Sequence, residues 1–355
     1  MTAPRGRWTV LVPAALLALA VVLMWWRGPE WEIVRDVFTA VSWRWIVAAV
    51  ALNLLSIVVR AYAWHTVIKQ AVAAPRPRFP TVFSAFCVGL FANVVLPGRV
   101  GELARVAVLA RRMPERQGIW GTLIGTVFAH RMFDLFPALA LVVWVLLAAK
   151  LPHWAVTSLA IAFVVGFGLL TFAVVSAKRQ GRPLDELGTV RVLIESARRG
   201  LGVLRAPVPA AIATFFQVLG WIFQLAAVWA TMRAFDIDEP LAAAGLVLVL
   251  MNVATIFPLW PGNFGLVQAA VALPLVRYGV SYARGFAFGI GLQAIEASVG
   301  VGVGLLFLAR EGLSFAMLKR MPDAAQAEVP EEEANDAGDG GAVEPKRRLV
   351  GGRRR

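Results

Sequence analysis

Long apolar runs separated by short polar segments fill most of the chain between residues 8 and 310. A helix needs about 20 mainly apolar residues to cross a bilayer. By that measure, with boundaries that shift by a few residues, the pattern predicts eight membrane spans: 8–26, 45–68, 81–96, 118–149, 154–176, 208–232, 240–259 and 284–309. Two further apolar segments, 97–112 and 261–279, begin at Pro-Gly pairs, which interrupt helices. We therefore predict an all-α polytopic membrane protein with two short or re-entrant helices.

The amino-acid composition agrees with a membrane protein and limits the kinds of binding site to expect. Hydrophobic residues make up 59% of the chain and charged residues only 16%, whereas soluble domains contain about 25% charged residues. The single Cys87 and the three scattered histidines predict neither a disulfide nor a metal site, and we expect no cofactor. The net charge of +13 comes from arginines spread over short loops, which favours anionic lipid headgroups as partners over nucleic acid.

Three regions differ in character. Residues 1–44 are predicted to form a retained anchor helix and an amphipathic interfacial segment at 27–44, which could equally be a packed connecting helix. Residues 45–320 form the transmembrane domain. Residues 321–355 are acidic and then basic, with no aromatic residues, which is typical of a disordered tail.

Orientation follows from basic residues in short loops. Loop 177–207 is rich in arginine and is predicted to be cytoplasmic, whereas loop 233–239 carries three acids against one arginine and is predicted to be external. If both interrupted segments are counted as crossings, both termini lie in the cytoplasm.

An internal repeat is the most informative feature of the sequence. The segments "NVVLPGRVGELARVA" at 93–107 and "NVATIFPLWPGNFGLVQAAVA" at 252–272 share an Asn, a Pro-Gly pair and a second Gly three residues after the first. An acid follows in the next long span of each copy, Asp134 and Glu296. The repeat units cover about 81–149 and 240–309, and the predicted topology inverts one relative to the other. Inverted repeats with interrupted helices are typical of secondary transporters.

The first broken segment carries charges into the membrane. Glu102 lies three residues from both Arg99 and Arg105, so all three share one helix face, and Arg131 and Asp134 repeat this spacing in the next span. An intramembrane charge costs about 2.5–3.5 kcal/mol on insertion scales, so each needs a partner or a function. The candidate binding residues are Arg99, Glu102, Arg105, Arg131, Asp134, Asn93, Asn252, Asn263, Gln268 and Glu296.

Three explanations of these charges remain open. They form ion pairs that only hold the helices together, or the surplus of arginine binds a phosphate headgroup bidentately, or Arg99 extends to the outer surface.

Four motifs together resemble the transmembrane region of the lysylphosphatidylglycerol synthase and flippase-like family. They are "RAYAWHTVI" at 60–68, "LFANVVLPGRVGELARVAVLARR" at 90–112, "HRMFD" at 130–134 and "FPLWPGNFGLVQAA" at 257–270. The resemblance covers about 45–310 and implies a bacterial or archaeal inner-membrane protein that moves lipids or glycolipids between leaflets. Family members usually have Glu where this chain has His130 and Gln268, which implies a less negative cavity. Some carry a fused aminoacyl-transferase domain that we do not expect here.

Three functional readings follow. The first is a flippase for lipids or glycolipids with anionic headgroups. The second is a non-catalytic membrane partner of a separately encoded lipid-modifying enzyme. The third, a membrane transferase, is disfavoured because Glu102, Asp134 and Glu296 are predicted to lie too deep to meet a soluble donor, so we expect no enzymatic activity.

Overall fold

The computed structural model describes Val22 and residues 29–96, 100–114, 119–149, 206–255 and 263–312. Within these ranges every regular element is a helix. Four helices are long and apolar enough to cross a membrane: α3 (Trp43–Ala71), α6 (Ile119–Ala148), α9 (Pro207–Ala234) and α12 (Tyr282–Arg310). The prediction of an all-helical membrane protein is confirmed.

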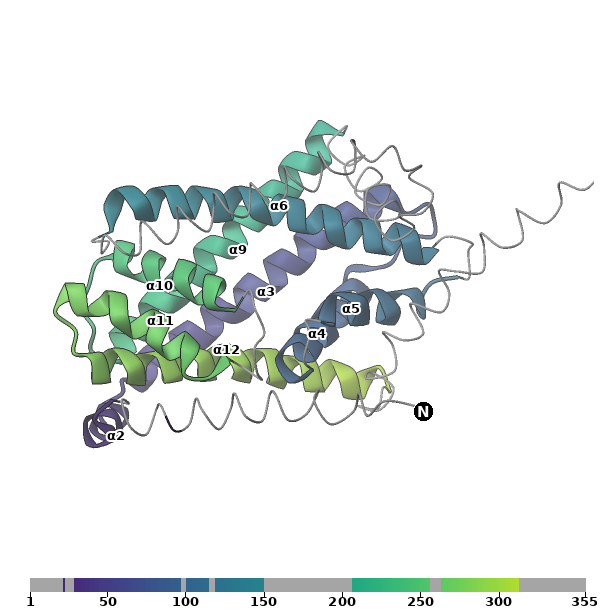
Figure 1. Cartoon of the computed structure of the whole chain (residues 1–355). Helices are drawn as coiled ribbons and strands as arrows, with labels where there is room; N and C mark the ends of the chain where they lie inside the picture. The colour runs from purple at the N-terminus through teal and green to yellow at the C-terminus, as the bar shows by residue number, and fades with distance from the viewer. Residues whose placement is uncertain are drawn as a thin grey trace, which may run out of the picture.

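The helices α3 and α9 form the centre of the molecule and run antiparallel (Figure 1). The N–H of Ser42, just before α3, donates to the carbonyl oxygen of Ala234 at the end of α9, over 3.0 Å. Midway along the pair, the hydroxyl of Ser56 donates to the carbonyl oxygen of Gly220, over 2.8 Å. Gly220 has no side chain, so the two helices can approach closely at this point.

Each central helix is followed by the same succession of elements. After α3 come a short helix α4 (Phe79–Val95), a break, the ten-residue helix α5 (Gly101–Ala110) and the long helix α6. After α9 come a short helix α10 (Leu241–Ala254), a break, the ten-residue helix α11 (Leu266–Leu275) with a 3₁₀ turn, and the long helix α12. The repeat seen in the sequence is thus matched by the order and length of the helices.

The two sets of helices pack reciprocally. The short helix α4 packs against α12 of the second set, and the short helix α10 packs against α6 of the first. As a result there are two large apolar cores, and both long helices contribute to each. Leu123 of α6 and Leu308 of α12 belong to one core, whereas Val145 of α6 and Leu292 of α12 belong to the other.

The breaks fall where the Pro-Gly pairs predict them, and α4 ends within one residue of its predicted span, whereas α10 ends at Ala254, before the predicted residue 259. α4 has 17 residues and α10 has 14, so at 1.5 Å per residue both are shorter than the roughly 30 Å hydrocarbon core. The predicted spans 81–96 and 240–259 therefore correspond to the first arms of broken segments. Spans 8–26 and 154–176 and the tail 321–355 lie outside the described residues, so the count of eight stays a prediction.

A short amphipathic helix, α2 (Trp31–Thr39), precedes α3. Its Val34 is buried against α12, and the ring of Trp31 contacts Phe286 edge to face, while Ile33 and Phe38 are exposed. One face of α2 packs on the bundle, as a connecting helix would, and the exposed Phe38 also contacts the ring of Phe235 edge to face. A place at the membrane interface stays a prediction.

Candidate functional site

The candidate site lies where the first broken segment meets the long helices α6, α3 and α9. The chain reverses direction between α4 and α5, and the two helices cross at Gly89 and Gly101, where their backbones are in contact. The side-chain Oδ1 of Asn93 accepts a hydrogen bond from the N–H of Gly101 over 2.8 Å. That bond satisfies one of the free N–H groups that any helix start exposes. Glu102 is the next residue, so the break fixes its position.

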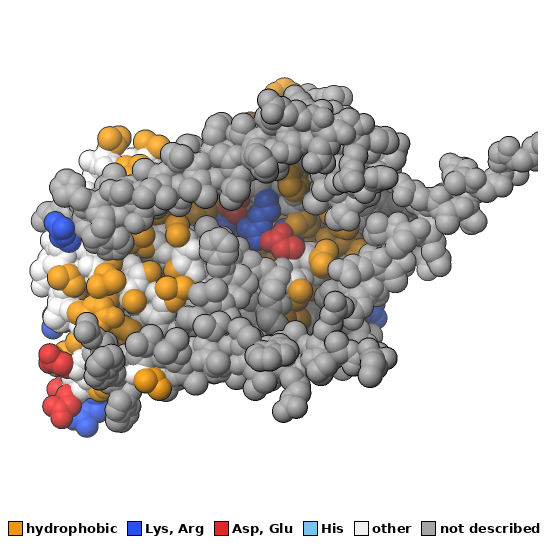
Figure 2. Space-filling view, in the orientation of Figure 1, with side chains coloured by type: hydrophobic (Ala, Val, Ile, Leu, Met, Phe, Trp, Pro, Cys, Tyr) orange, Lys and Arg blue, Asp and Glu red, His pale blue; other side chains and the backbone are white. Residues whose placement is uncertain are grey.

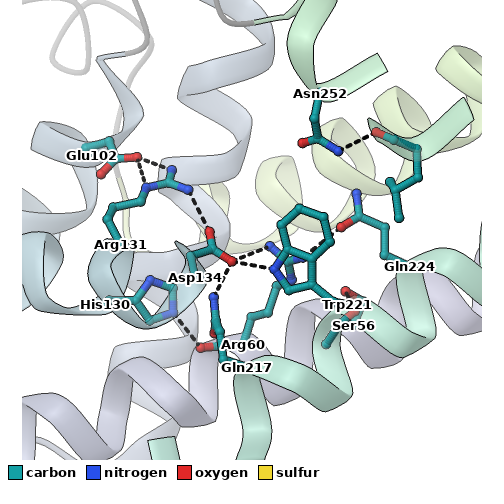
Figure 3. A network of polar contacts seen from close by, with 12 residues as sticks. Ser56, Arg60, Glu102, His130, Arg131, Asp134, Gln217, Trp221, Gln224 and Asn252 are labelled. Atoms are coloured by element: carbon teal, nitrogen blue, oxygen red, sulfur yellow. Dashed lines mark hydrogen bonds and ion pairs between the residues drawn. The ribbon is translucent and has the colours of Figure 1, made fainter. Parts of the chain in front are cut away.

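Glu102 forms ion pairs with two arginines. Its Oε2 lies 3.2 Å from Nη2 of Arg105 on the same helix. Its Oε1 accepts a hydrogen bond of 2.8 Å from Nε of Arg131 on α6 and a second, shorter one from Nη2 of Arg131 (Figure 3). The predicted neighbourhood of Glu102 with Arg105 is present, and Arg131 approaches the same carboxylate with two donors that converge on one oxygen.

Asp134 continues the network toward α9. Its Oδ2 lies 3.2 Å from Nη1 of Arg131. Its Oδ1 accepts hydrogen bonds of 2.6 Å from Nε2 of Gln217 and 2.6 Å from the indole Nε1 of Trp221, and lies 3.6 Å from Nη1 of Arg60 on α3 (Figure 3). Asp134 faces the interior of the bundle, with only 13% of its side chain exposed.

Two of the arginines are held by aromatic rings as well as by acids. The guanidinium carbon of Arg105 lies 4.7 Å from the ring centre of Trp64 and 5.6 Å from that of Phe86. The guanidinium carbon of Arg60 lies 5.1 Å from the ring centre of Trp221, and its Nη2 donates to Oε1 of Gln224 over 2.7 Å. Such stacking stabilises a cation that has been removed from water.

The network reaches the surface of the described helices at one point. Figure 2 shows basic and acidic side chains together in a hollow near the middle of one face, among apolar side chains. Of the paired residues, Arg131 is the most open, with 51% of its side chain exposed, against 6% for Arg105 and 17% for Arg60. The site can therefore present a guanidinium group to a ligand at this opening.

Glu296 connects the second set of helices to this network. It lies on α12, is half-buried, interacts with the side chain of Gln224 and is within electrostatic range of Arg60. Gln224 thus stands between Glu296 and Arg60.

The remaining polar candidates have structural partners at the breaks. Oε1 of the fully buried Gln268 accepts from the N–H of Gly265 over 2.6 Å, and its Nε2 donates to Oε1 of Gln293 over 2.5 Å. Asn263 donates to the carbonyl oxygen of Ala254 over 2.8 Å and so ties the two sides of the second break together. Like Asn93, these amides satisfy backbone groups that the breaks leave open.

The candidate Asn252 has an exposed side chain. It donates a hydrogen bond to the carbonyl oxygen of Leu248 on its own helix over 2.8 Å. Arg99, the remaining candidate, lies outside the described residues.

Four residues of the network were not among the sequence candidates: Arg60, Gln217, Trp221 and Gln224. Arg60 could have been found from the sequence, because it is the one charged residue between Arg44 and Lys69, near the two ends of α3. The other three are neutral side chains on α9 whose partners become clear only once α9 is placed beside α3 and α6.

His130, which stands where the resemblance implies an acid, has a defined place. It is 97% buried, and its Nε2 donates to the carbonyl oxygen of Arg60 over 3.2 Å. It therefore links α6 to α3 rather than adding a negative charge. Among the described residues, no group of three or more His, Cys, Asp or Glu side chains could hold a metal ion.

Comparison with known protein families decides the affiliation. The model of the lysylphosphatidylglycerol synthase TM region matches residues 10–304. The chain belongs to this family. The match spans all the described helices except the end of α12 beyond residue 304, and the lysylphosphatidylglycerol synthase TM region is the membrane part of its namesake enzyme rather than a catalytic domain.

Two archaeal relatives in the lysylphosphatidylglycerol synthase TM region family are also similar to this chain. A UPF0104 membrane protein of Methanothermobacter thermautotrophicus is 23% identical over 284 residues, which are 75% of this chain and 81% of the relative. A UPF0104 membrane protein of Pyrococcus horikoshii is 28% identical over 138 residues, which are 39% of this chain and 40% of the relative. No solved structure matches the chain. The protein is thus a multi-pass helical membrane protein in a family of prokaryotic membrane proteins.

Proposed function

We propose that the protein moves lipids with anionic headgroups between the leaflets of a prokaryotic inner membrane. The observation that carries the proposal is the network at the first break, in which, among the described residues, the guanidinium groups of Arg60, Arg105 and Arg131 pair with the carboxylates of Glu102 and Asp134. Glu296 adds a third acid within electrostatic range of Arg60. Three guanidinium groups close together, one of them half exposed, suit a phosphate group, which arginine binds with two parallel hydrogen bonds.

The arrangement of the helices supports transport rather than a purely structural role. We infer that α3–α6 and α9–α12 are two units related by a pseudo-two-fold axis in the membrane plane. The antiparallel pairing of α3 with α9, the matching order of helices and the reciprocal packing of α4 on α12 and α10 on α6 favour this relation. Transporters with such repeats bind their substrates at broken helices near the unit interface.

A second candidate function rests on the family comparison. The matched family is named after the membrane region of a synthase, which favours a non-catalytic membrane partner of a separately encoded lipid-modifying enzyme. In that case the arginines of the network would only stabilise the fold.

Translocation in proteoliposomes tests the proposal. Purified protein is reconstituted with phosphatidylglycerol that carries a fluorophore on one acyl chain, and a membrane-impermeant reductant bleaches the outer leaflet. We expect the protein to make the inner-leaflet pool accessible, and a labelled glycolipid without phosphate to respond less. Arg131→Gln should reduce the rate, while Arg78→Gln, at an exposed position before α4, should not. Rates equal to those of protein-free liposomes would contradict translocation.

A further inference from the structure

The three arginines of the network differ in what their removal would leave behind. If Arg131 turned away, Glu102 would keep Nη2 of Arg105 at 3.2 Å. Asp134 would keep the hydrogen bonds of 2.6 Å from Gln217 and Trp221. Both carboxylates would therefore stay paired or hydrogen-bonded, and neither would become an isolated buried charge.

Arg105 and Arg60, unlike Arg131, are held in place by their surroundings. Each has a buried Nε atom without a hydrogen-bond partner and a guanidinium group over an aromatic ring. Moving either one would break the stacking and pull a charge across apolar surroundings. Their exposed fractions of 6% and 17% agree with fixed positions, whereas the 51% exposure of Arg131 leaves room for a second partner.

We infer that Arg131 is the exchangeable arginine of the network: it leaves Glu102 and Asp134 to bind a phosphodiester, while Arg60 and Arg105 remain in place to neutralise the two acids. This assignment rests on the proposed function and names the group that contacts the ligand. The planar fork that donates two bonds to Oε1 of Glu102 is the same fork that matches two phosphate oxygens.

The exchange also explains why the acids are present. Without Glu102 and Asp134, the empty site would hold three guanidinium groups at close range, which repel one another and lack counter-charges. With them, Arg131 has partners in the empty state that a ligand can replace, and the remaining pairs neutralise Glu102 through Arg105 and Asp134 through Arg60.

Lipid binding without translocation tests the assignment directly. The full chain in neutral detergent is titrated with phosphatidylglycerol, phosphatidylcholine, a phosphate-free glycolipid or inorganic phosphate, and the apparent affinity is read from the rise in unfolding temperature. The variants are Arg131→Gln, Arg131→Lys and Arg105→Gln, with Arg78→Gln as the matched exposed control.

We expect Arg131→Gln to unfold at nearly the wild-type temperature without lipid but to bind phosphatidylglycerol at least about tenfold more weakly, the order expected for a lost charge-assisted hydrogen bond. Arg131→Lys should retain part of the affinity, because it keeps the charge but loses the fork. Arg105→Gln should instead lower the unfolding temperature in the absence of lipid.

Each contrary result has its own meaning. Unchanged phosphatidylglycerol affinity in Arg131→Gln would overturn the assignment, even if wild-type protein translocates lipid. An equal response to inorganic phosphate at the same concentration would overturn a lipid headgroup as the ligand. Wild-type protein that neither prefers phosphatidylglycerol nor translocates it would refute the proposed function itself.

Discussion

At the scale of single residues, Glu102 has the most connected side chain of the site. It is 72% buried, pairs with Arg105 on its own helix and with Arg131 on α6, and follows directly on the break that Asn93 caps. One carboxylate therefore joins the short helix α5 to the long helix α6 and also neutralises a fully enclosed guanidinium group.

Removing the charge of Glu102 should destabilise the protein. Glu102→Gln leaves Arg105 without an ionic partner among the contacts described for it, and breaking a buried pair from one side typically costs about 3–5 kcal/mol. We expect a clearly lower unfolding temperature in detergent, measured by differential scanning fluorimetry. Glu32→Gln on the exposed side of α2 is the control and should match wild type. A Glu102→Gln protein as stable as wild type would show that Arg105 does not depend on this pair.

Sequence spacing predicted the acidic and basic members of the network better than its neutral members. Glu102, Arg105, Arg131 and Asp134 were found because charges in apolar runs are costly and because a spacing of three places them on one helix face. Arg60 was missed because no second charge lies three residues from it. Gln217 and Trp221 were not found, since Gln and Trp in a helix carry no comparable signal.

The four amide candidates were selected by their positions in the repeat and, for Gln268, also in the family motif. A repeat fixes order along the chain but not the direction in which a side chain points. Asn252 is thus exposed, and Gln268 caps a helix.

At the scale of elements, the crossing of α4 and α5 depends on two glycines. A methyl group at position 101 would lie 2.0 Å from the carbonyl oxygen of Gly89 and 2.5 Å from Oδ1 of Asn93. Both neighbours belong to α4, one as backbone and the other as the side chain that caps α5, so neither can move without separating the two helices.

Gly101→Ala should therefore lower stability by roughly 1–3 kcal/mol, the usual cost of overpacking. Gly302→Ala on α12 is a matched control, because nothing lies within 4 Å of the added methyl group. There the change should be neutral, or stabilising by up to about 1 kcal/mol through higher helix propensity. The midpoints of thermal unfolding in detergent compare the two, and equal midpoints would contradict a close crossing at Gly101.

Hydropathy and the Pro-Gly pairs located the breaks and the end of α4, but not the end of α10. Pro-Gly pairs interrupt the backbone wherever they occur, so segments 97–112 and 261–279 were predictable. The end of α4 at Val95 lies within one residue of the predicted span, whereas α10 ends at Ala254 although residues 255–259 are as apolar in pattern as the helix itself. Apolarity indicates surroundings that lack water, and it does not by itself specify a helical backbone.

At the scale of the whole molecule, the proposed inversion of the two units relative to one another predicts which side of the membrane each turn faces. The turn before α4 and the turn before α10 hold equivalent places in the two sets, so they should face opposite sides of the membrane. In a Cys87→Ala background, we expect Arg78→Cys to react with an impermeant maleimide only from the cytoplasmic side and Asp238→Cys only from the external side. Both positions are exposed. Labelling of both from the same side would exclude the inversion.

The reciprocal packing of α4 on α12 and of α10 on α6 bears on how such a chain could have arisen. Either unit by itself would leave the apolar side of its long helix uncovered where the other unit's short helix now lies. Two identical copies of one ancestral unit, inserted in the membrane in opposite orientations, would cover each other in the same way. Fusion of the two genes would then have freed one copy to keep the charged network at its break, while the other came to close its break with neutral amides.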